Sequence, residues 1–227
     1  MHPSAMRNGQ LFFDTYASRL AQGVVVDIGA QDVNGSLRTV CPPQLQFIGV
    51  DFVPGRGVDV VLDDPYRLPF DDASVDVVVS SSCFEHSELF WVLFLEIMRV
   101  LKSPGLFYLN APSNGTFHRY PVDCWRFYPD SGRALVTWAQ RNGVDACVLE
   151  SYVSRQDNAV WSDFVSVFLK GSAHAGLFPA RITQVFKDFY NGQVLGDATF
   201  LNPQEYPEDL QRLYAQTQAA DEDGAGA

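Results

Sequence analysis

The sequence predicts one α/β domain whose doubly wound, mostly parallel sheet ends in an antiparallel C-terminal edge hairpin. Short apolar runs rich in valine alternate with helical patterns along the first half of the chain, as in parallel sheets that are buried on both faces. Two later strand patterns are separated by only a short polar stretch, so they should pair antiparallel. A chain of 227 residues is long enough for one such core and short for two.

The expected elements follow in chain order. A helix is expected first, at 10–22, because apolar residues such as Leu11, Phe12 and Tyr16 recur there at helical spacing. Five short apolar runs are then expected to form strands, at 24–29, 46–51, 58–62, 75–80 and 105–110. A helix at 131–142 and the hairpin strands at 146–152 and 164–169 complete the domain.

The strongest helical pattern lies between the last two of these five strands, at 87–102. Its polar residues cover about a third of the circumference, so most of its surface must be covered. Trp91 and Leu95 point into the polar arc. Packing against the sheet is the favoured interpretation, and a subunit interface that would give a homodimer is the alternative.

Composition limits the class of protein and of partner. The net charge of −11 argues against a nucleic-acid surface, which needs a basic stripe. The four cysteines form no C-x-x-C pair and favour free thiols over a zinc site or disulfides. The chain start has no signal-peptide pattern, and the longest apolar run, 89–95, is too short for a membrane span, so a cytoplasmic protein is expected. One domain is expected at 1–215, followed by a disordered acidic tail at 216–227.

The chemistry is expected at the ends of the first two strands. Gly29 follows Asp27 at the end of the first strand, where a glycine lets the backbone turn sharply and approach a ligand closely. Asp51 ends the second strand and can accept hydrogen bonds from both hydroxyls of a ribose, each worth about 1.5–3 kcal/mol. The two features together indicate an adenosine-type cofactor.

A dinucleotide cofactor fits this loop poorly. Its site requires G-x-G-x-x-G, whereas residues 29–35 read Gly-Ala-Gln-Asp-Val-Asn-Gly. Asp32 would oppose a pyrophosphate and would tolerate a cationic sulfonium.

From residue 24 to residue 113 the chain resembles the class I S-adenosylmethionine (SAM)-dependent methyltransferases. The resemblance is carried by segments in the same order and spacing as in that family, at 25–30, 48–51, 64–78, 85–86 and 99–105. It implies a Rossmann-like fold and SAM as cofactor. The residues that it implies for cofactor binding are Asp27, Gly29, Ala30, Gln31, Gly35, Asp51, Phe52, Asp64, Tyr66 and Ser82.

Two departures from the family pattern affect these expectations. Gln31 and Val33 replace the second and third glycines of the first motif, and Gly35 is expected to restore flexibility to a longer loop. Asp64, by analogy the acceptor for the adenine amine, precedes Pro65, which has no N–H. The backbone donor for adenine is therefore expected elsewhere, at Tyr66.

The loop at 111–130 follows the fifth strand and should lie at the cofactor face, where it would meet the methyl acceptor. Aromatic and polar residues crowd it, and those expected to bind substrate are Arg119, Tyr120, Trp125, Arg126 and Tyr128. The plainer interpretation is a loop whose aromatics cover the core. This loop, together with the segment at 32–36, resembles those of methyltransferases from bacterial polysaccharide and glycan biosynthesis. The resemblance implies a sugar hydroxyl as acceptor. A non-sugar small molecule and a non-catalytic SAM-binding module are the alternatives.

His118 is the expected general base, because an imidazole titrates near neutrality, and Asp123 is its orienting partner or the alternative base. His86 is the next candidate, although it could equally cap a helix. Some sugar methyltransferases use Mg²⁺, but the carboxylates here show no ligand spacing, so no metal ligand is predicted.

Overall fold

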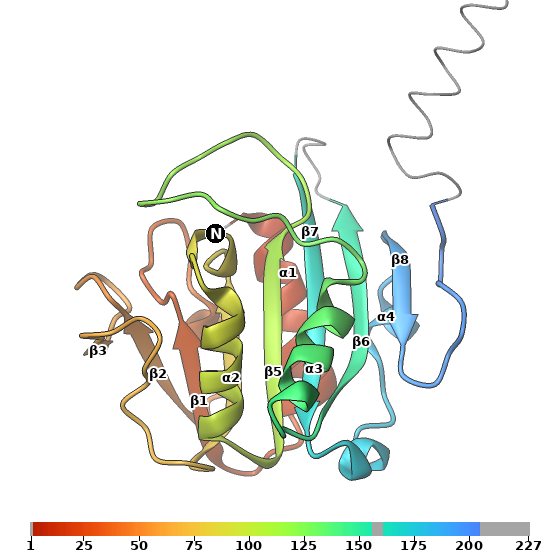
Figure 1. The fold of residues 1–227 in the computed structure, drawn as a ribbon, viewed down its shortest axis with the longest axis horizontal. Coiled ribbons are helices and arrows are strands. Elements are labelled where there is room, and N and C mark those ends of the chain that lie inside the picture. Colours follow the sequence, from red (N-terminus) through yellow and green to blue (C-terminus); the bar gives the residue numbers. More distant parts are fainter. Residues whose placement is uncertain (1, 156–160, 205–227) are drawn as a thin grey trace, which may run out of the picture.

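The computed structural model describes residues 2–155 and 161–204, which form one sheet with helices packed on both faces (Figure 1). Within these residues the sheet has eight strands in the order β3-β2-β1-β4-β5-β7-β6-β8. The strands are β1 (Gly23–Ile28), β2 (Leu45–Asp51), β3 (Val60–Val61), β4 (Val75–Ser81), β5 (Leu101–Pro112), β6 (Ala146–Arg155), β7 (Ser162–Lys170) and β8 (Phe189–Val194).

The first five strands pair in parallel and the last three antiparallel, so the predicted doubly wound fold with an antiparallel C-terminal part is confirmed. Strand β7 lies between β5 and β6, and the hairpin of β6 and β7 is not itself the edge, because β8 pairs with β6 outside it. Strand β8 was not predicted, because its Asn191 and Gly192 favour turns over strands. The predicted strand at 58–62 is reduced to the two residues of β3.

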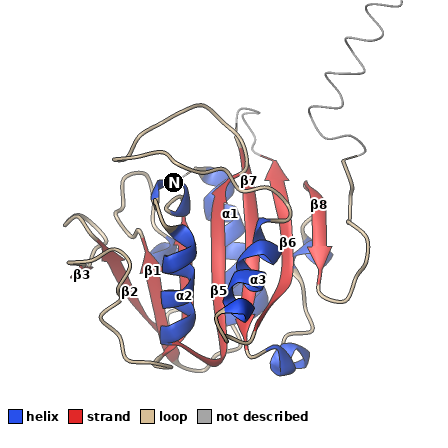
Figure 2. Cartoon of the chain, viewed as in Figure 1, coloured by secondary structure: helices blue, strands red, loops and turns tan. Residues whose placement is uncertain are grey.

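Helices lie on both faces of the sheet, and Figure 2 shows α2 and α3 in front of it with α1 behind. Their bounds are α1 (Pro3–Phe12), α2 (Phe90–Val100), α3 (Ser131–Arg141) and α4 (Ile182–Val185). The expectation of a helix at 10–22 is wrong at both ends, because α1 begins at Pro3 and its π-helical continuation ends at Ala17. Proline in the first helical turn, where its missing N–H costs nothing, marks the true start.

Helix α2 is shorter than the predicted 87–102. It stops at Val100 because Leu101 already pairs with Val75 as the first residue of β5. Trp91 and Leu95 are partly buried and pack against the core on this face, and the Trp138 indole of α3 donates to the Trp91 carbonyl at 3.1 Å. These contacts match the interpretation that this helix packs within the domain. The homodimer stays a prediction.

Two apolar clusters hold the layers together, one on each face of the sheet. On the α2 face the rings of Phe107 and Phe168 stack at 5.4 Å, and Phe94 of α2 lies edge-on to Phe168 at 5.0 Å. On the α1 face Phe12 stacks on Tyr108 at 4.8 Å. Full burial of each such ring stabilises the fold by about 1.5–3 kcal/mol.

None of the helices among the described residues is both long and apolar enough to cross a membrane. The predicted tail at 216–227 lies outside the described residues, so the division into a domain at 1–215 and a tail stays a prediction. The parallel strands bring their carboxyl ends to one edge of the sheet, which is where ligand sites form in such folds.

Candidate functional site

A cavity of about 760 Å³ opens at the carboxyl ends of β1, β2 and β4, beneath the loop that follows β5. This volume lies in the range of small-molecule and cofactor sites, about 300–1,000 Å³. Its wall contains nine of the ten residues predicted to bind the cofactor, together with the base candidate His86. The nine are Asp27, Gly29, Ala30, Gln31, Gly35, Asp51, Phe52, Tyr66 and Ser82. The loop after β5 adds His118, Arg119 and Tyr120.

The turn after β1 is built around Gly29. Its φ is +79°, and a Cβ placed there would lie 2.6 Å from the Cβ of Cys83, so only glycine fits. The backbone N–H groups of Gly29 and Ala30 both donate to the Val50 carbonyl, at 3.0 and 3.1 Å. These bonds clamp the turn against the end of β2 and leave its open side to the cavity.

Asp32 faces away from the cavity and does not belong to its wall. Its carboxylate accepts a bond from the Gly35 N–H at 2.8 Å and pairs with Arg56 at 3.0 Å. The Gly35 N–H is the main cause that lowers the pKa of Asp32, and Arg56 adds to it. The Asp32 carboxylate therefore shapes the loop after β1.

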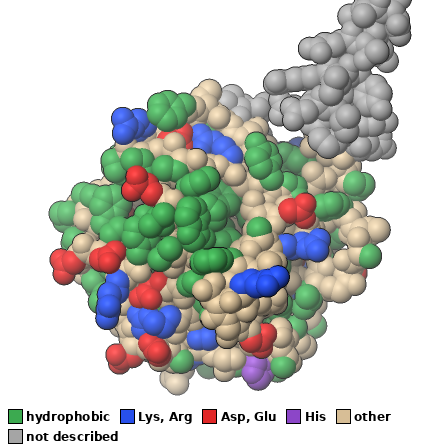
Figure 3. All heavy atoms as spheres, in the orientation of Figure 1, with side chains coloured by type: hydrophobic (Ala, Val, Ile, Leu, Met, Phe, Trp, Pro, Cys, Tyr) green, Lys and Arg blue, Asp and Glu red, His purple; other side chains and the backbone are tan. Residues whose placement is uncertain are grey.

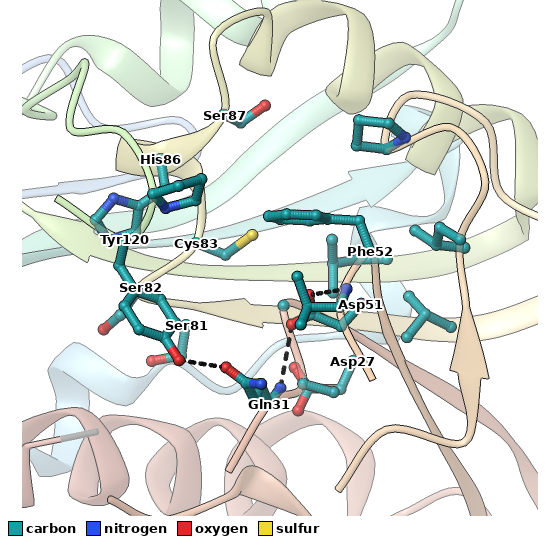
Figure 4. Close-up of a pocket in the computed structure, with 18 of the residues that line it drawn as sticks. Asp27, Gln31, Asp51, Phe52, Ser81, Ser82, Cys83, His86, Ser87 and Tyr120 are labelled. Carbon is teal, nitrogen blue, oxygen red and sulfur yellow. Dashed lines mark hydrogen bonds between the residues drawn. The ribbon is translucent and has the colours of Figure 1, made fainter. Parts of the chain in front are cut away.

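Asp51 joins the two loops at this end of the cavity. One carboxylate oxygen accepts the Gln31 N–H at 3.3 Å and the other accepts the Val53 N–H at 3.1 Å. Asp51 remains a wall residue, and Figure 4 shows the Phe52 ring extending from beside it across the cavity. A carboxylate in this position can bind the hydroxyls of a ribose, and the aromatic ring beside it can cover an adenine.

Asp27 makes this end of the cavity unusually acidic. It is buried at the end of β1, and desolvation raises its pKa to about 8, with Asp51 adding to the shift and Arg38 opposing it. Burial therefore favours the protonated form of Asp27. A cation bound nearby would favour its ionised form, which suits a positively charged ligand.

The turn after β4 forms the floor of the cavity. Ser82 adopts a left-handed conformation, with φ +55°, and its N–H donates to the Asn110 carbonyl at 2.9 Å. Such backbone strain in a non-glycine residue concentrates at functional sites. The neighbouring Ser81 hydroxyl lines the cavity and is buried without a hydrogen-bond partner among the described residues, so a ligand could supply one.

The predicted adenine-side residues are placed differently from one another. Pro65 and Tyr66 line the cavity, whereas Asp64 is exposed and does not. The Asp64 carboxylate accepts the Tyr66 N–H at 2.8 Å, so the donor expected to meet adenine is engaged in this turn. The Tyr66 hydroxyl accepts the Leu89 N–H at 3.1 Å.

The loop after β5 divides into a cavity-facing part and a supporting part. His118, Arg119 and Tyr120 face the cavity, and the Tyr120 hydroxyl donates to the Gln31 side chain at 2.5 Å (Figure 4). The other predicted substrate residues and Asp123 lie outside the wall. Arg126 forms two bonds to the Asp123 carboxylate, at 2.6 and 2.9 Å.

Trp125 and Tyr128 serve the supporting part. The Trp125 indole donates to the Ser87 carbonyl at 3.0 Å and packs edge-on against Phe90 at 5.3 Å. The Tyr128 N–H donates to the Ser131 hydroxyl at the start of α3. For Trp125 the plainer expectation, a ring that covers the core, matches its placement.

The two candidate bases lie together at the end of the cavity away from Asp51. The rings of His86 and His118 meet edge to face at 4.9 Å. His118 Nδ1 lies 3.5 Å from the Asp123 carboxylate, whose pKa is held at about 2, mainly by Arg126. Burial lowers the pKa of His86, and its Nδ1 is bonded to the Val122 carbonyl.

Glu85 had no predicted role, and its carboxylate lies 3.7 Å from the Nε2 atom of His86. The Glu85 side chain is buried, and desolvation raises its pKa to about 8. Also not predicted were the cavity residues Ser81 and Cys83 and the contact of His118 with Trp161, at 5.1 Å. A polar residue at the end of β4 was the one signal that could have indicated Ser81.

Comparison with known proteins identifies similar folds and a family model that matches most of the first half of the chain. Residues 11–109 match a protein-family model described as a methyltransferase domain. No curated protein sequence matches the chain.

Solved structures show the same fold at low identity. The 1,6-didemethyltoxoflavin-N1-methyltransferase of Burkholderia thailandensis, solved with 1,6-didemethyltoxoflavin and S-adenosylhomocysteine, superposes with a TM-score of 0.57 at 17% identity, over 74% of this chain and 78% of that one. The [4+2]-cyclase SpnF superposes with a TM-score of 0.55 at 13% identity, over 73% and 81%. Two such different activities on one fold mean that the reaction must be argued from the site.

Proposed function

We propose that this protein is a SAM-dependent methyltransferase that methylates a hydroxyl of a sugar in a glycan or glycoconjugate. The observation that carries the proposal is the division of one cavity into two ends. The glycine turn, Asp27 and Asp51 form an acidic end that suits an adenosine-bearing sulfonium, while His86 and His118 lie at the other end. The matched methyltransferase domain supports SAM as the cofactor, and SAM supplies the methyl group when bound.

The residues of the first end fit this cofactor. Asp51 would hold the ribose hydroxyls, and Phe52 would cover the adenine, because both line the cavity side by side. The open side of the Gly29 turn lets the backbone approach the ligand closely. The Ser81 hydroxyl, buried without a partner among the residues described, is a donor that a bound ligand can use.

The residues of the second end suit a hydroxyl acceptor. The Asp123 carboxylate accepts the His118 backbone N–H at 2.7 Å and lies 3.5 Å from Nδ1 of the ring. A carboxylate there favours the proton on Nδ1, so the Nε2 atom of a neutral imidazole can take the proton of the acceptor hydroxyl. Arg119 and Tyr120 beside it can hydrogen-bond to sugar hydroxyls. Positioning of the two reactants would supply most of the rate, and the base about 10²–10⁴-fold more.

A non-sugar small molecule is the second candidate acceptor, and one observation favours it. Figure 3 shows apolar side chains gathered over α2 and the loops beside it. The exposed apolar residues of these segments include Leu89, Val92 and Phe117, of which Phe117 is 75% exposed. These three residues lie outside the cavity wall, so they would favour an apolar acceptor that extends beyond the cavity onto this surface.

The proposal is tested by an acceptor screen with labelled SAM on the full chain. We expect label transfer to a sugar hydroxyl, with His118→Ala lowering kcat while SAM affinity stays within about twofold, because a base acts in the transition state. Transfer only to non-sugar acceptors would favour the second candidate. SAM binding without release of S-adenosylhomocysteine from any acceptor would indicate a binding module or another reaction on this fold. A homodimer and a cytoplasmic location stay predictions.

A further inference from the structure

Glu85, His86 and His118 converge at the wall of the cavity from two separate segments. Glu85 and His86 belong to the turn that follows β4, and His118 to the loop that follows β5. One donor atom of each residue, two imidazole nitrogens and a carboxylate oxygen, lies within 4.8 Å of the others. Metal–ligand bonds of about 2.0–2.2 Å would require these atoms to move closer to one another by about 1 Å.

Both imidazoles are oriented by acceptors on the same ring nitrogen. The Nδ1 of His86 is bonded to the Val122 carbonyl. The Nδ1 of His118 lies 3.4 Å from the Thr116 carbonyl and 3.5 Å from the Asp123 carboxylate. Acceptors there place the proton on Nδ1 and leave the Nε2 lone pair free, the arrangement that metal-binding histidines adopt.

The Glu85 carboxylate forms no ion pair with a lysine or arginine among the described residues, although the charge of Arg126 acts on it from a distance. The Glu85 side chain is 2% exposed, and Oε2 is buried without a hydrogen-bond partner among the residues that the structure describes. Its Oε1 lies 3.7 Å from His86 Nε2. The nearby Arg126 is already engaged in two bonds to Asp123. Burying a carboxylate without full compensation is unfavourable, and a bound cation would remove the penalty.

We propose that Glu85, His86 and His118 bind one divalent transition-metal ion, of the class of Zn²⁺. Two imidazoles and one carboxylate suit Zn²⁺, Co²⁺ or Fe²⁺ better than Mg²⁺ or Ca²⁺, which prefer oxygen ligands alone. Three protein ligands leave coordination positions open, as in catalytic sites. His86 and His118 both line the cavity, so the open positions face the acceptor end.

This ion would deepen the proposed function, on which the following step rests. A hydroxyl oxygen of the acceptor at an open position would lose its proton to solvent water more easily, because the ion would lower its pKa. In that state His118 is a ligand, and Asp123 acts on the site through His118 as a positioning residue. Sequence spacing gave no sign of the site, because its three ligands meet only through the path of the loop after β5.

The test measures metal binding directly on the full chain, without cofactor or acceptor. Protein stripped with a chelator and dialysed is titrated with ZnCl₂ in a calorimeter, and the visible absorption of added Co²⁺ reports the ligand field. We expect one ion per chain and a Co²⁺ spectrum of a site with nitrogen ligands. Glu85→Gln, His86→Asn and His118→Asn should each weaken Zn²⁺ binding by about tenfold or more.

His174→Asn is the matched control, because His174 is exposed in the turn at Ser172–Leu177 and should leave the affinity unchanged. Each variant must melt near the parent, and Glu85→Gln keeps the side-chain shape should a histidine variant fail to fold. Absence of a stoichiometric ion, or equal affinity in the parent and in Glu85→Gln, would overturn the proposal. SAM affinity is measured on the same stripped protein, so that failure of the metal proposal can be told apart from failure of the proposed function. Protein that binds SAM but not Zn²⁺ would contradict only the metal site.

Discussion

Asp51 is the residue on which the cofactor end of the cavity depends most. Its two oxygens hold the backbone of the loops after β1 and β2, and it still faces the cavity. A ligand ribose would therefore meet a carboxylate that is already fixed in place, so little ordering entropy is lost when it binds.

Asp51→Ala should weaken SAM binding by about tenfold or more, because each charge-assisted bond contributes about 1.5–3 kcal/mol. The measurement is calorimetric titration with SAM. Asp71→Ala removes an exposed carboxylate from the loop before β4 and serves as the matched control. Equal affinities of Asp51→Ala and the parent would mean that the ribose lies elsewhere.

Asp27 should make the free energy of unfolding fall as the pH rises. Desolvation raises its pKa in the folded protein to about 8 from an unfolded value of 3.8, so the folded state retains a proton that the unfolded state loses. The contribution of this group to the free energy of unfolding is fully present below about pH 4 and is lost as the pH rises through about 8. Between these two values the loss amounts to up to about 1.4 kcal/mol per pH unit.

The comparison of Asp27→Asn with the parent isolates this effect, because asparagine stays neutral while other groups titrate in both proteins. Denaturant unfolding between about pH 5 and pH 8 should show a smaller loss of stability in Asp27→Asn than in the parent. Parallel stability curves for the two proteins would show that Asp27 is ionised in the folded state.

At the scale of elements, the loop after β5 and the loop after β1 act as one unit across the cavity. The Tyr120 hydroxyl bonded to Gln31 is the contact that joins them, and the Gln31 N–H is in turn bonded to Asp51. The supporting part of the loop, through Trp125 and Arg126, fixes its base against α2 and Asp123. Cofactor and acceptor sites are therefore expected to influence each other through this contact.

Tyr120→Phe should weaken SAM binding and raise the acceptor KM by about two- to tenfold, the range of one hydrogen bond. The melting temperature should change little, because Tyr120 is exposed. Tyr128→Phe removes a hydroxyl from an exposed tyrosine in the supporting part of the same loop and should match the parent in both measurements. If both variants match the parent, the loop and the cofactor site are independent.

At the scale of the whole molecule, the elements that could be predicted are those that a local pattern of apolar residues determines. The parallel strands, and the positions at which they end, could be predicted from apolar runs such as those of β1 and β4. Both strands are buried on both faces of the sheet. Gly29 and Asp51 were predicted at the cavity because they directly follow such runs. Strand β8 was missed because pairing with β6, and not its own sequence, holds Asn191 and Gly192 in a strand.

The loop after β5 shows why the other end of the site could not be predicted in detail. Its residues were expected at the cavity as a group, yet His118 faces the cavity while Trp125 packs on α2. That division depends on long-range bonds, such as those from the Cys124 and Trp125 N–H groups to the Glu85 carbonyl, at 2.8 and 3.2 Å. Sequence periodicity carries no information on contacts between segments of this kind.

Calorimetric titration of the full chain with SAM and with S-adenosylhomocysteine tests the central claim most directly, since the proposed methyl transfer depends on this cofactor. We expect each compound to bind once per chain and to raise the melting temperature by mass action. Folded protein that gives no binding heat and no change in melting temperature with either compound would contradict the account.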